Sequence, residues 1–223
     1  VLPPEPLKAF MARGIPVSNV YGSTETGPFS IALPPDRAAT HIGSCGWPAP
    51  GVEIRLLDAL GRPVAAGKVG EIAVRAPNVV ARYWPDRPAL DADGFFHSGD
   101  LAQQAEDGSF TVVGRAKDMI ISGGFNIYPS DLESVIVGHP AVLEAAVVGA
   151  LSDRWGETPV AFVTLKAGAT ATADEVRDWA NAKLGKTQRL AALKLMDVLP
   201  RSAIGKVLKR ELRDQFMAEE TVA

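Results

Sequence analysis

The stretch GRAKDMIISGGFNIYP, residues 114–129, decides how the chain is organised. It places three charged residues, Arg115, Lys117 and Asp118, before an apolar run, and two glycines and a polar-aromatic turn follow that run. A plain strand–turn–helix junction would need neither the charges nor the paired glycines. Before this stretch the sequence pattern predicts mainly β structure, and after it strands alternate with helices. We therefore expect a domain boundary near Lys117.

Composition limits the function classes that need to be considered. The 223 residues suggest one large or two small domains, and 47% apolar with 22% charged residues is ordinary for a globular protein. A net charge of −3 without a basic block argues against a nucleic-acid partner. The longest apolar run, residues 145–151, is too short to span a membrane.

The single cysteine, Cys45, excludes an internal disulfide and fits a reducing compartment, so we expect a cytoplasmic protein. No signal peptide is visible. The sequence begins at Val1 and reaches its first methionine only at Met11, which suggests a piece of a longer protein.

The first half of the chain has the signals of a short helix followed by strands. A helix is predicted over residues 4–14 and loops over the Pro- and Gly-rich residues 29–51. Strands are predicted over residues 15–22, 52–58 and 70–76. A hairpin is predicted over residues 94–115, with its turn at Asp107-Gly108.

The second half alternates between strand and helix signals. A capping box of Ser130 and Glu133 predicts a helix to about Gly138, and Thr172 with Glu175 predicts a second capped helix. A final helix is expected over residues 207–217, and strands over residues 143–150, 158–166 and 193–199. The predicted fold class is therefore α/β (α+β): a β-rich part, then a small part with a central sheet and flanking helices.

Residues 20–28, VYGSTETGP, combine several groups that suit a nucleotide. Gly22 allows the backbone to approach a ligand closely, and hydroxyl groups can donate to a phosphate. The carboxylate of Glu25 could hold Mg²⁺, and the face of Tyr21 could stack on a base. Read alone, these letters are more typical of a polar turn after a strand.

Two further residues have similar double interpretations. Asp100, within HSGDLA, is a carboxylate that suits a pair of ribose hydroxyls, although read alone it is more typical of a turn aspartate. Lys206 follows Gly205 on a loop bounded by Pro and Gly, where a lysine can clamp a phosphate as a compact charge or merely be solvated.

Together and in this order, several stretches resemble the motifs of the acyl-adenylate-forming enzymes, a superfamily that includes acyl-CoA synthetases and the adenylation domains of peptide synthetases. The stretches are YGSTE (21–25), GSCGWPAPGVEI (43–54), HSGD (97–100), GRAKDMIISGGFNIYPSDLE (114–133), SDRWGETPVAFV (152–163) and PRSAIGKVLKREL (200–212). The resemblance runs from Val1 to about Phe216.

The resemblance implies a two-step reaction. A carboxylate attacks the α-phosphate of ATP with Mg²⁺, giving acyl-AMP and pyrophosphate, and the thiol of CoA then takes the acyl group and releases AMP. It also implies that residues 1–116 are the barrel-like end of a large AMP-binding domain. Residues 117–223 are then a small mobile C-terminal domain whose first strand includes residues 119–121.

Roles follow position by position from the same resemblance. Tyr21 stacks on adenine, Gly22 and Thr24 lie at the phosphates, and Asp100 with Arg115 holds the ribose. Glu25 holds Mg²⁺, Lys117 is the hinge, and Lys206 is the catalytic lysine of the first step. Gly123 and Gly124 line the tunnel for the pantetheine arm of CoA, although a hairpin turn with positive φ also explains them.

The sequence departs from the family in two respects. Some members carry a second lysine four residues after the hinge, where this chain has Ile121. The Ser/Thr/Gly-rich phosphate loop and most of the acyl pocket are not among these residues, so the chain corresponds to the C-terminal portion of an acyl-CoA synthetase and is expected to be inactive alone.

Two alternatives stay open: a non-catalytic module that binds nucleotide weakly, and a peptide-synthetase adenylation domain. CoA is favoured over a carrier protein because residues 123–133 resemble the CoA-ligase form and the sequence ends without a carrier-domain serine motif. Fatty, aryl and short dicarboxylic acids all remain possible substrates. The oligomeric state cannot be predicted from the sequence.

Overall fold

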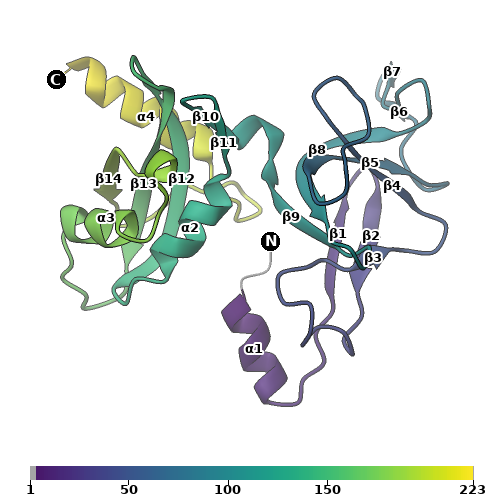
Figure 1. Cartoon of the computed structure of the whole chain (residues 1–223), viewed down its shortest axis with the longest axis horizontal. Coiled ribbons are helices and arrows are strands. Elements are labelled where there is room, and N and C mark those ends of the chain that lie inside the picture. The colour runs from purple at the N-terminus through teal and green to yellow at the C-terminus, as the bar shows by residue number, and fades with distance from the viewer. Residues whose placement is uncertain (1–3, 223) are drawn as a thin grey trace. The chain divides into compact units, whose positions relative to one another are not determined.

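The computed structural model describes residues 4–222, and contacts along the chain divide it between Ala116 and Lys117 into two compact units (Figure 1). The first unit is built mainly of strands, and the second combines a sheet with helices. This arrangement confirms the predicted mixed α/β class. In the part of the chain that the structure describes, no helix is long and apolar enough to cross a membrane.

The first unit begins with helix α1 (Pro4–Ala12) and a three-stranded antiparallel sheet of β1 (Asn19–Ser23), β2 (Gly27–Leu33) and β3 (Trp47–Pro48). The prediction of loops over residues 29–51 was therefore wrong at both ends of the range, where β2 and β3 lie, while residues 34–45 contain neither helix nor strand. The alternating Ile31 and Leu33 are fully buried and hold β2 in the sheet despite the surrounding Pro and Gly.

The second sheet of this unit has the order β4 (Glu53–Leu57), β5 (Val69–Arg75), β8 (Phe96–Gln104) and β9 (Phe110–Arg115), all antiparallel. A small ribbon of β6 (Arg82–Tyr83) and β7 (Arg87–Pro88) lies between β5 and β8 in sequence. The β8–β9 hairpin turns at Asp107-Gly108, where Gly108 has φ +83°.

The second unit opens with a short 3-10 helix (Ala116–Asp118). Its strands are β10 (Ile120–Ser122), β11 (Phe125–Ile127), β12 (Val142–Ser152), β13 (Gly156–Leu165) and β14 (Ala192–Leu195). Its helices are α2 (Pro129–Val137), α3 (Ala173–Asn181) and α4 (Lys209–Val222), with a 3-10 turn at Lys186–Gln188. The sheet order is β11-β10-β13-β12, and β14 pairs in parallel with β13.

The central sheet of the second unit is covered on both faces, as Figure 1 shows. Val147 and Val163 pack with residues of α2 and α3, whereas Val148 and Phe162 pack with Leu212 and other residues of α4. Successive side chains of a strand point to opposite faces, so the apolar runs of β12 and β13 supply both cores.

One of the two predicted capping boxes forms. At α3, the Thr172 side chain accepts from the backbone N–H of Glu175, and the Glu175 carboxylate accepts from the backbone N–H of Thr172. The predicted box of Ser130 and Glu133 was wrong, because the carboxylate of Glu133 accepts from Val147 N at 2.8 Å and pairs with Lys209 Nζ at 2.6 Å. Glu133 therefore ties α2 to β12 and α4 instead of capping its own helix.

The final helix starts at Lys209, two residues later than predicted. Val207 instead forms an isolated antiparallel bridge with Arg201, which closes a turn before the helix. This turn holds Lys206.

Candidate functional site

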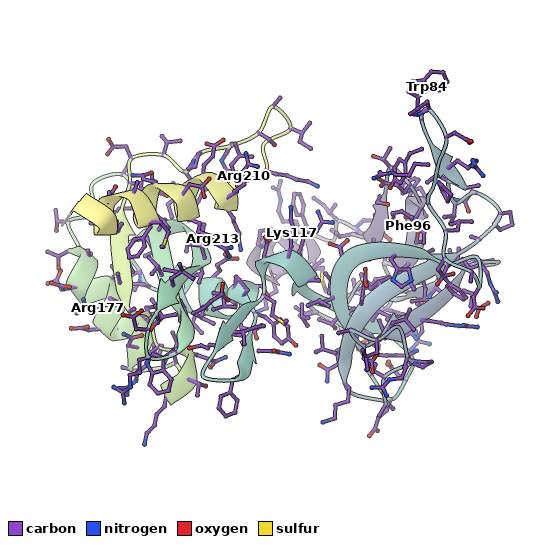
Figure 2. All side chains as sticks on the ribbon, turned by 90° about the horizontal axis from the view of Figure 1, so that it is seen from above. Trp84, Phe96, Lys117, Arg177, Arg210 and Arg213 are labelled. Atoms are coloured by element: carbon purple, nitrogen blue, oxygen red, sulfur yellow. The ribbon has the colours of Figure 1, made fainter. Side chains whose placement is uncertain are left out.

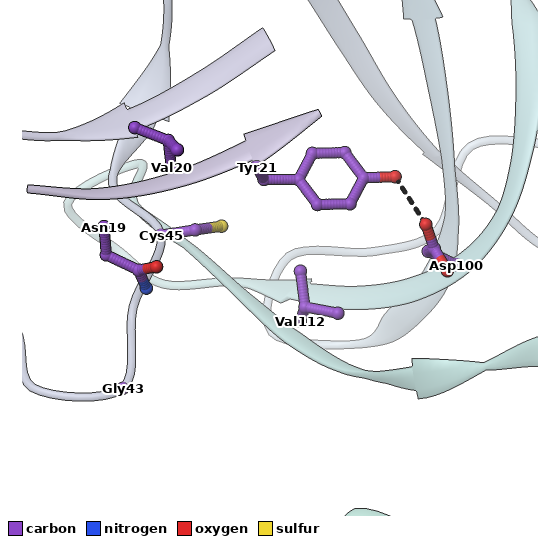
Figure 3. A pocket seen from close by; sticks show the side chains of 7 residues that line it. All are labelled: Asn19, Val20, Tyr21, Gly43, Cys45, Asp100 and Val112. Atoms are coloured by element: carbon purple, nitrogen blue, oxygen red, sulfur yellow. Dashed lines mark hydrogen bonds between the residues drawn. The ribbon is translucent and has the colours of Figure 1, made fainter. Parts of the chain in front are cut away.

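A pocket of about 280 Å³ lies in the first unit beside the side chain of Tyr21 (Figure 3). It is lined by Asn19, Val20, Tyr21, Gly43, Cys45, Asp100 and Val112. Strand β1 supplies Tyr21, and its hydroxyl donates a 2.9 Å hydrogen bond to Oδ2 of Asp100 on β8. The ring of Tyr21 thus forms an aromatic wall of the pocket, with a carboxylate at its far end.

Asp100 also joins the pocket to Arg115. The two residues are opposite each other in the antiparallel pairing of β8 with β9, so their side chains share one face. Arg115 Nε lies 2.9 Å from Asp100 Oδ1, and its Nη2 donates to the carbonyl of Ser98 at 3.1 Å. Three residues that the sequence assigned to the nucleotide therefore lie together.

The buried side of the pocket is neutral. Burial raises the pKa of Tyr21 far above its usual value, and the nearby carboxylate of Asp100 raises it further. Burial also raises the pKa of the Cys45 thiol to about 11, and this thiol donates to the carbonyl of Phe110. Both groups therefore stay protonated near neutral pH, so Tyr21 acts as a donor to Asp100 and the Cys45 thiol is a poor nucleophile.

The β1–β2 turn places Thr24 and Glu25 outside this pocket wall. Thr24 is exposed, and Thr26 beside it is buried and accepts from the backbone N–H of Ser23. A Cβ at Gly22 would lie 2.1 Å from the carbonyl oxygen of Gly27. Gly22 is therefore required by the close approach of β1 and β2, whatever it does toward a ligand.

Glu25 is half-buried and held from two sides. Its Oε1 accepts a 3.1 Å hydrogen bond from the hydroxyl of Tyr83, and its backbone carbonyl accepts from Val80 N. Within residues 4–222, no cluster of three or more His, Cys, Asp or Glu could hold a metal ion. A lone carboxylate fits Mg²⁺ that arrives on nucleotide phosphates, because Mg²⁺ is commonly held by one or two carboxylates together with substrate phosphates.

Sequence reasoning missed the residues that support this turn. Tyr83 lies 58 positions from Glu25, and Asn78 donates to the carbonyl of Thr26 from 52 positions away. The YW pair at residues 83–84 was a possible aromatic signal, but Trp84 is 94% exposed at the end of the β6–β7 ribbon (Figure 2) and only Tyr83 turns toward the site.

In the second unit, Gly123 and Gly124 form the turn between β10 and β11, with φ of +56° and +82°. Gly123 N donates to the carbonyl of Trp155, and a Cβ on Gly123 would lie 2.9 Å from the Trp155 ring. A Cβ on Gly124 would meet no described atom within 4 Å. The hairpin alone thus explains the two positive φ angles, and open space lies beside Gly124.

The two predicted lysines are both exposed in the second unit. Lys117 lies in the 3-10 helix that begins this unit (Figure 2). Lys206 lies in the turn before α4, where its backbone carbonyl accepts from Ser202 N at 2.8 Å and its N–H donates to Ser202 Oγ at 3.2 Å. The backbone of Lys206 is thus fixed while its ammonium faces solvent.

Comparison of the sequence with known protein families identifies the family of this chain. The sequence model of the family described as AMP-binding enzyme matches residues 1–84. The sequence model of the family described as AMP-binding enzyme C-terminal domain matches residues 131–206. The chain belongs to the AMP-binding enzyme family. Both units carry family sequence, so the motifs that suggested the resemblance are not chance similarities.

Several relatives of this family member are CoA ligases. Indoleacetate–CoA ligase of Aromatoleum aromaticum is 39% identical over 99% of the chain, and 2-succinylbenzoate–CoA ligase of Geobacillus kaustophilus is 41% identical over 94%. The structure resembles o-succinylbenzoate CoA synthetase of Bacillus subtilis in complex with its acyl-adenylate intermediate. The TM-score is 0.87 at 36% identity, over 95% of this chain and 44% of that one. The chain spans 44% of the length of each of these relatives.

Proposed function

We propose that the whole protein is an ATP-dependent, AMP-forming acyl-CoA ligase and that this chain supplies its nucleotide-holding end and its small C-terminal domain. The observation that carries the proposal is the pocket lined by Tyr21 and Asp100, with Arg115 paired to Asp100, in a family member with CoA ligases among its relatives.

The first unit would hold ATP. The pocket beside Tyr21 accepts the adenine ring, since the aromatic face of Tyr21 and the apolar side chains of Val20 and Val112 in its lining suit a base. Asp100 accepts hydrogen bonds from the ribose hydroxyls, while Arg115 orients its carboxylate and adds a donor. Gly22 and Thr24 lie at the phosphates, with the exposed Thr24 as hydroxyl donor. Glu25 would hold Mg²⁺, which when bound neutralises phosphate charge.

The first chemical step joins the carboxylate to the nucleotide. A carboxylate oxygen attacks the α-phosphorus, the bond to the bridging oxygen breaks, and pyrophosphate leaves. Negative charge builds on the phosphoryl oxygens, and a cation aimed at them lowers the barrier. The family resemblance assigns that cation to Lys206, and its fixed backbone and exposed side chain are compatible with this role.

The second step transfers the acyl group to sulfur. The thiolate of CoA attacks the acyl carbon, and AMP leaves with the phosphate oxygen. Gly124 offers the open space that a pantetheine arm needs. Lys117, at the junction of the two units, serves as the hinge between the two steps. The solved B. subtilis relative is known in complex with ATP and magnesium, which supports the same cofactors here.

The test is a panel of carboxylic acids given to the full-length protein with ATP, Mg²⁺ and CoA. Indoleacetate, 2-succinylbenzoate and a medium-chain fatty acid are the first choices. We expect AMP and an acyl-CoA to form in equal amounts with at least one acid. Formation of acyl-AMP without a thioester would point to another acceptor, such as a carrier protein. An absence of AMP with every acid would favour the non-catalytic module.

A further inference from the structure

The turn that carries Lys206 is built as a small hairpin, which we call the Lys206 loop (residues 201–207). Arg201 and Val207 close it as an isolated bridge, Ser202 N donates to the carbonyl of Lys206, and Gly205 N donates to the carbonyl of Ser202. Just outside it, Leu208 N donates to the carbonyl of Pro200 at 2.8 Å. The loop therefore has a defined backbone, although it projects into solvent.

Apolar packing anchors the Lys206 loop only at its base, where the partly buried Val207 packs against the core beside α4, and not at its tip. Its tip residue Ile204 is 78% exposed, and Ala203, Gly205 and Lys206 are exposed as well. A loop with little buried surface opens easily unless polar contacts tie it to the rest of the fold. The direction of the Lys206 ammonium then depends on those polar contacts.

Arg201 provides such a contact in two directions at once. Its Nη1 donates to the carbonyl of Gly205, within the loop, at 2.7 Å. Its Nη2 donates to Oε1 of Glu144 on β12. The planar guanidinium thus joins the residue before Lys206 to a strand of the central sheet, with a geometry that lysine could not reproduce.

Glu144 attaches the loop to a strand of the central sheet. Glu144 lies near the start of β12, opposite Thr164 of β13, at an irregularity of the pairing next to the buried Val142. Both side chains of the Arg201–Glu144 pair are partly exposed, at 38% and 42%, so the pair adds little to global stability. Its effect is on the position of the loop.

We propose that Arg201, held by Glu144, is a positioning residue that fixes the Lys206 loop and so aims the Lys206 ammonium during adenylation. The role of Lys206 in adenylation rests on the proposed function. The attachment of the loop through Arg201 and Glu144 does not depend on that function. Loosening the loop lowers the population in which the ammonium is correctly placed, and rate falls with that population.

The experiment uses Glu144→Gln and Arg201→Lys in the full-length protein. Glu144→Gln removes the negative charge and keeps the shape of the side chain. Arg201→Lys keeps the positive charge but loses the two guanidinium nitrogens that donate to Gly205 and Glu144. The matched control is Glu219→Gln, which removes the exposed ion pair with Lys194 in the same unit and leaves the Lys206 loop intact. Amide hydrogen exchange of a peptide covering residues 200–208 reports on the loop, and the two half-reactions are measured separately.

We expect exchange in this peptide to quicken about fivefold in Glu144→Gln and Arg201→Lys, with the control unchanged. The kcat of adenylation should fall by a similar factor in both variants, with an unchanged KM for ATP. Thioester formation from supplied acyl-AMP should stay at the wild-type rate. A merely structural role would not separate the two half-reactions in this way.

Unchanged exchange at residues 200–208 would overturn the bracing, whatever the reaction proves to be. Faster exchange with unchanged adenylation, in a protein that Lys206→Ala inactivates, would overturn the positioning role alone. An active Lys206→Ala variant would overturn the proposed role of Lys206 and the positioning role with it, while the exchange data would still report on the brace.

Discussion

The Tyr21 hydroxyl and the Asp100 carboxylate meet at 2.9 Å, although 79 positions of sequence separate them. The second oxygen of the same carboxylate lies 2.9 Å from Nε of Arg115. One aspartate thus fixes a tyrosine on one side and an arginine on the other. A substitution at Asp100 should therefore alter the side-chain positions of both Tyr21 and Arg115. A substitution at Tyr21 should leave the pair of Asp100 and Arg115 in place.

The first prediction compares Asp100→Asn with Tyr21→Phe in the full-length protein. The amide lacks the charge that orients Arg115 and accepts from ribose, so ATP affinity should fall at least about tenfold. Phenylalanine keeps the aromatic wall and loses one neutral donor, so its loss should be about threefold or less. Isothermal titration with ATP measures both. Equal losses would show that the tyrosine hydroxyl matters as much as the carboxylate.

The elements with clear local signals were predicted from the sequence. Asp107-Gly108 marked the β8–β9 turn, and Thr172 with Glu175 marked the start of α3. Strand β2 was missed because Pro and Gly surround it, and its burial depends on partners elsewhere in the fold. The Ser130–Glu133 box failed because Glu133 found stronger partners in β12 and α4. Tertiary contacts outweighed a local pattern in both cases.

The candidate site was only partly predictable. Family motifs pointed to Tyr21, Asp100 and Arg115. The pairing of β8 with β9 brings Asp100 and Arg115 together, and Tyr21 joins them from another sheet through its side chain. Tyr83 supports Glu25 through a side-chain bond across 58 positions, and Arg201 supports the Lys206 loop through Glu144, 57 positions away. Such supports leave no periodic or local signal in a single sequence.

The second prediction concerns His97, whose Nδ1 lies 3.3 Å from Glu71 and whose Nε2 lies 3.1 Å from Asp91. Partial burial lowers the pKa of His97, but its bonds to Asp91 and Glu71 outweigh that effect and raise it overall. A raised folded-state pKa gives stability that is fully present below the unfolded value of about 6.5 and lost as pH rises through the folded value.

Urea unfolding of wild type and His97→Gln at about pH 5.5, below the unfolded pKa, and at a higher pH of about 8.5 checks this. We expect the difference in free energy of unfolding between the two proteins to shrink at the higher pH. A difference that stays constant, or grows, would contradict an ionised His97 in the folded state.

The third prediction tests the open space beside Gly124. Asparagine tolerates positive φ better than most residues, so Gly124→Asn should keep the turn at a cost of no more than about 1 kcal/mol. Its side chain would enter the space proposed for the pantetheine arm. Thioester formation from acyl-AMP should fall strongly, and adenylation should stay near the wild-type rate.

The matched control is Gly168→Asn. Gly168 has φ +80° and open space around it, but it follows β13 in a loop with no proposed role. It should show the same small loss of stability with both half-reactions intact. If Gly124→Asn behaved like this control, the glycine pair would serve only the hairpin.

The fourth prediction is that the 223-residue chain alone adenylates no carboxylate. Its residues hold a nucleotide pocket and Lys206, but the Ser/Thr/Gly-rich loop that would cradle the β- and γ-phosphates was not found in the sequence. ATP–pyrophosphate exchange over the same panel of acids provides the measurement, with the full-length protein as positive control. Exchange that depends on an added acid would show that the chain is catalytically sufficient.

The last prediction is that Lys206→Ala separates the two half-reactions of the full-length protein. Lys206 is exposed on its loop, and the hydrogen bonds of its backbone do not involve the side chain, so stability should change by less than about 0.5 kcal/mol. Loss of a cation aimed at a phosphoryl transition state typically costs about 10²–10³-fold in rate, so adenylation should fall by that amount. Attack of the thiol breaks the bond between the acyl carbon and the AMP oxygen and makes no bond to the α-phosphorus, so no pentavalent phosphorus forms and thioester formation should be much less affected.

Two assays on the same preparation of the Lys206→Ala variant test this prediction. One supplies carboxylate and ATP and measures adenylation, and the other supplies acyl-AMP and CoA and measures thioester formation. Lys209→Ala is a demanding comparison, because Lys209 is three residues away but pairs with Glu133 between α4 and α2. Its loss should reduce stability and leave the ratio of the two rates unaltered. If Lys206→Ala slowed both half-reactions equally, it would be acting on the fold as Lys209 does. If it slowed neither, the cation of the first step would have to come from another residue.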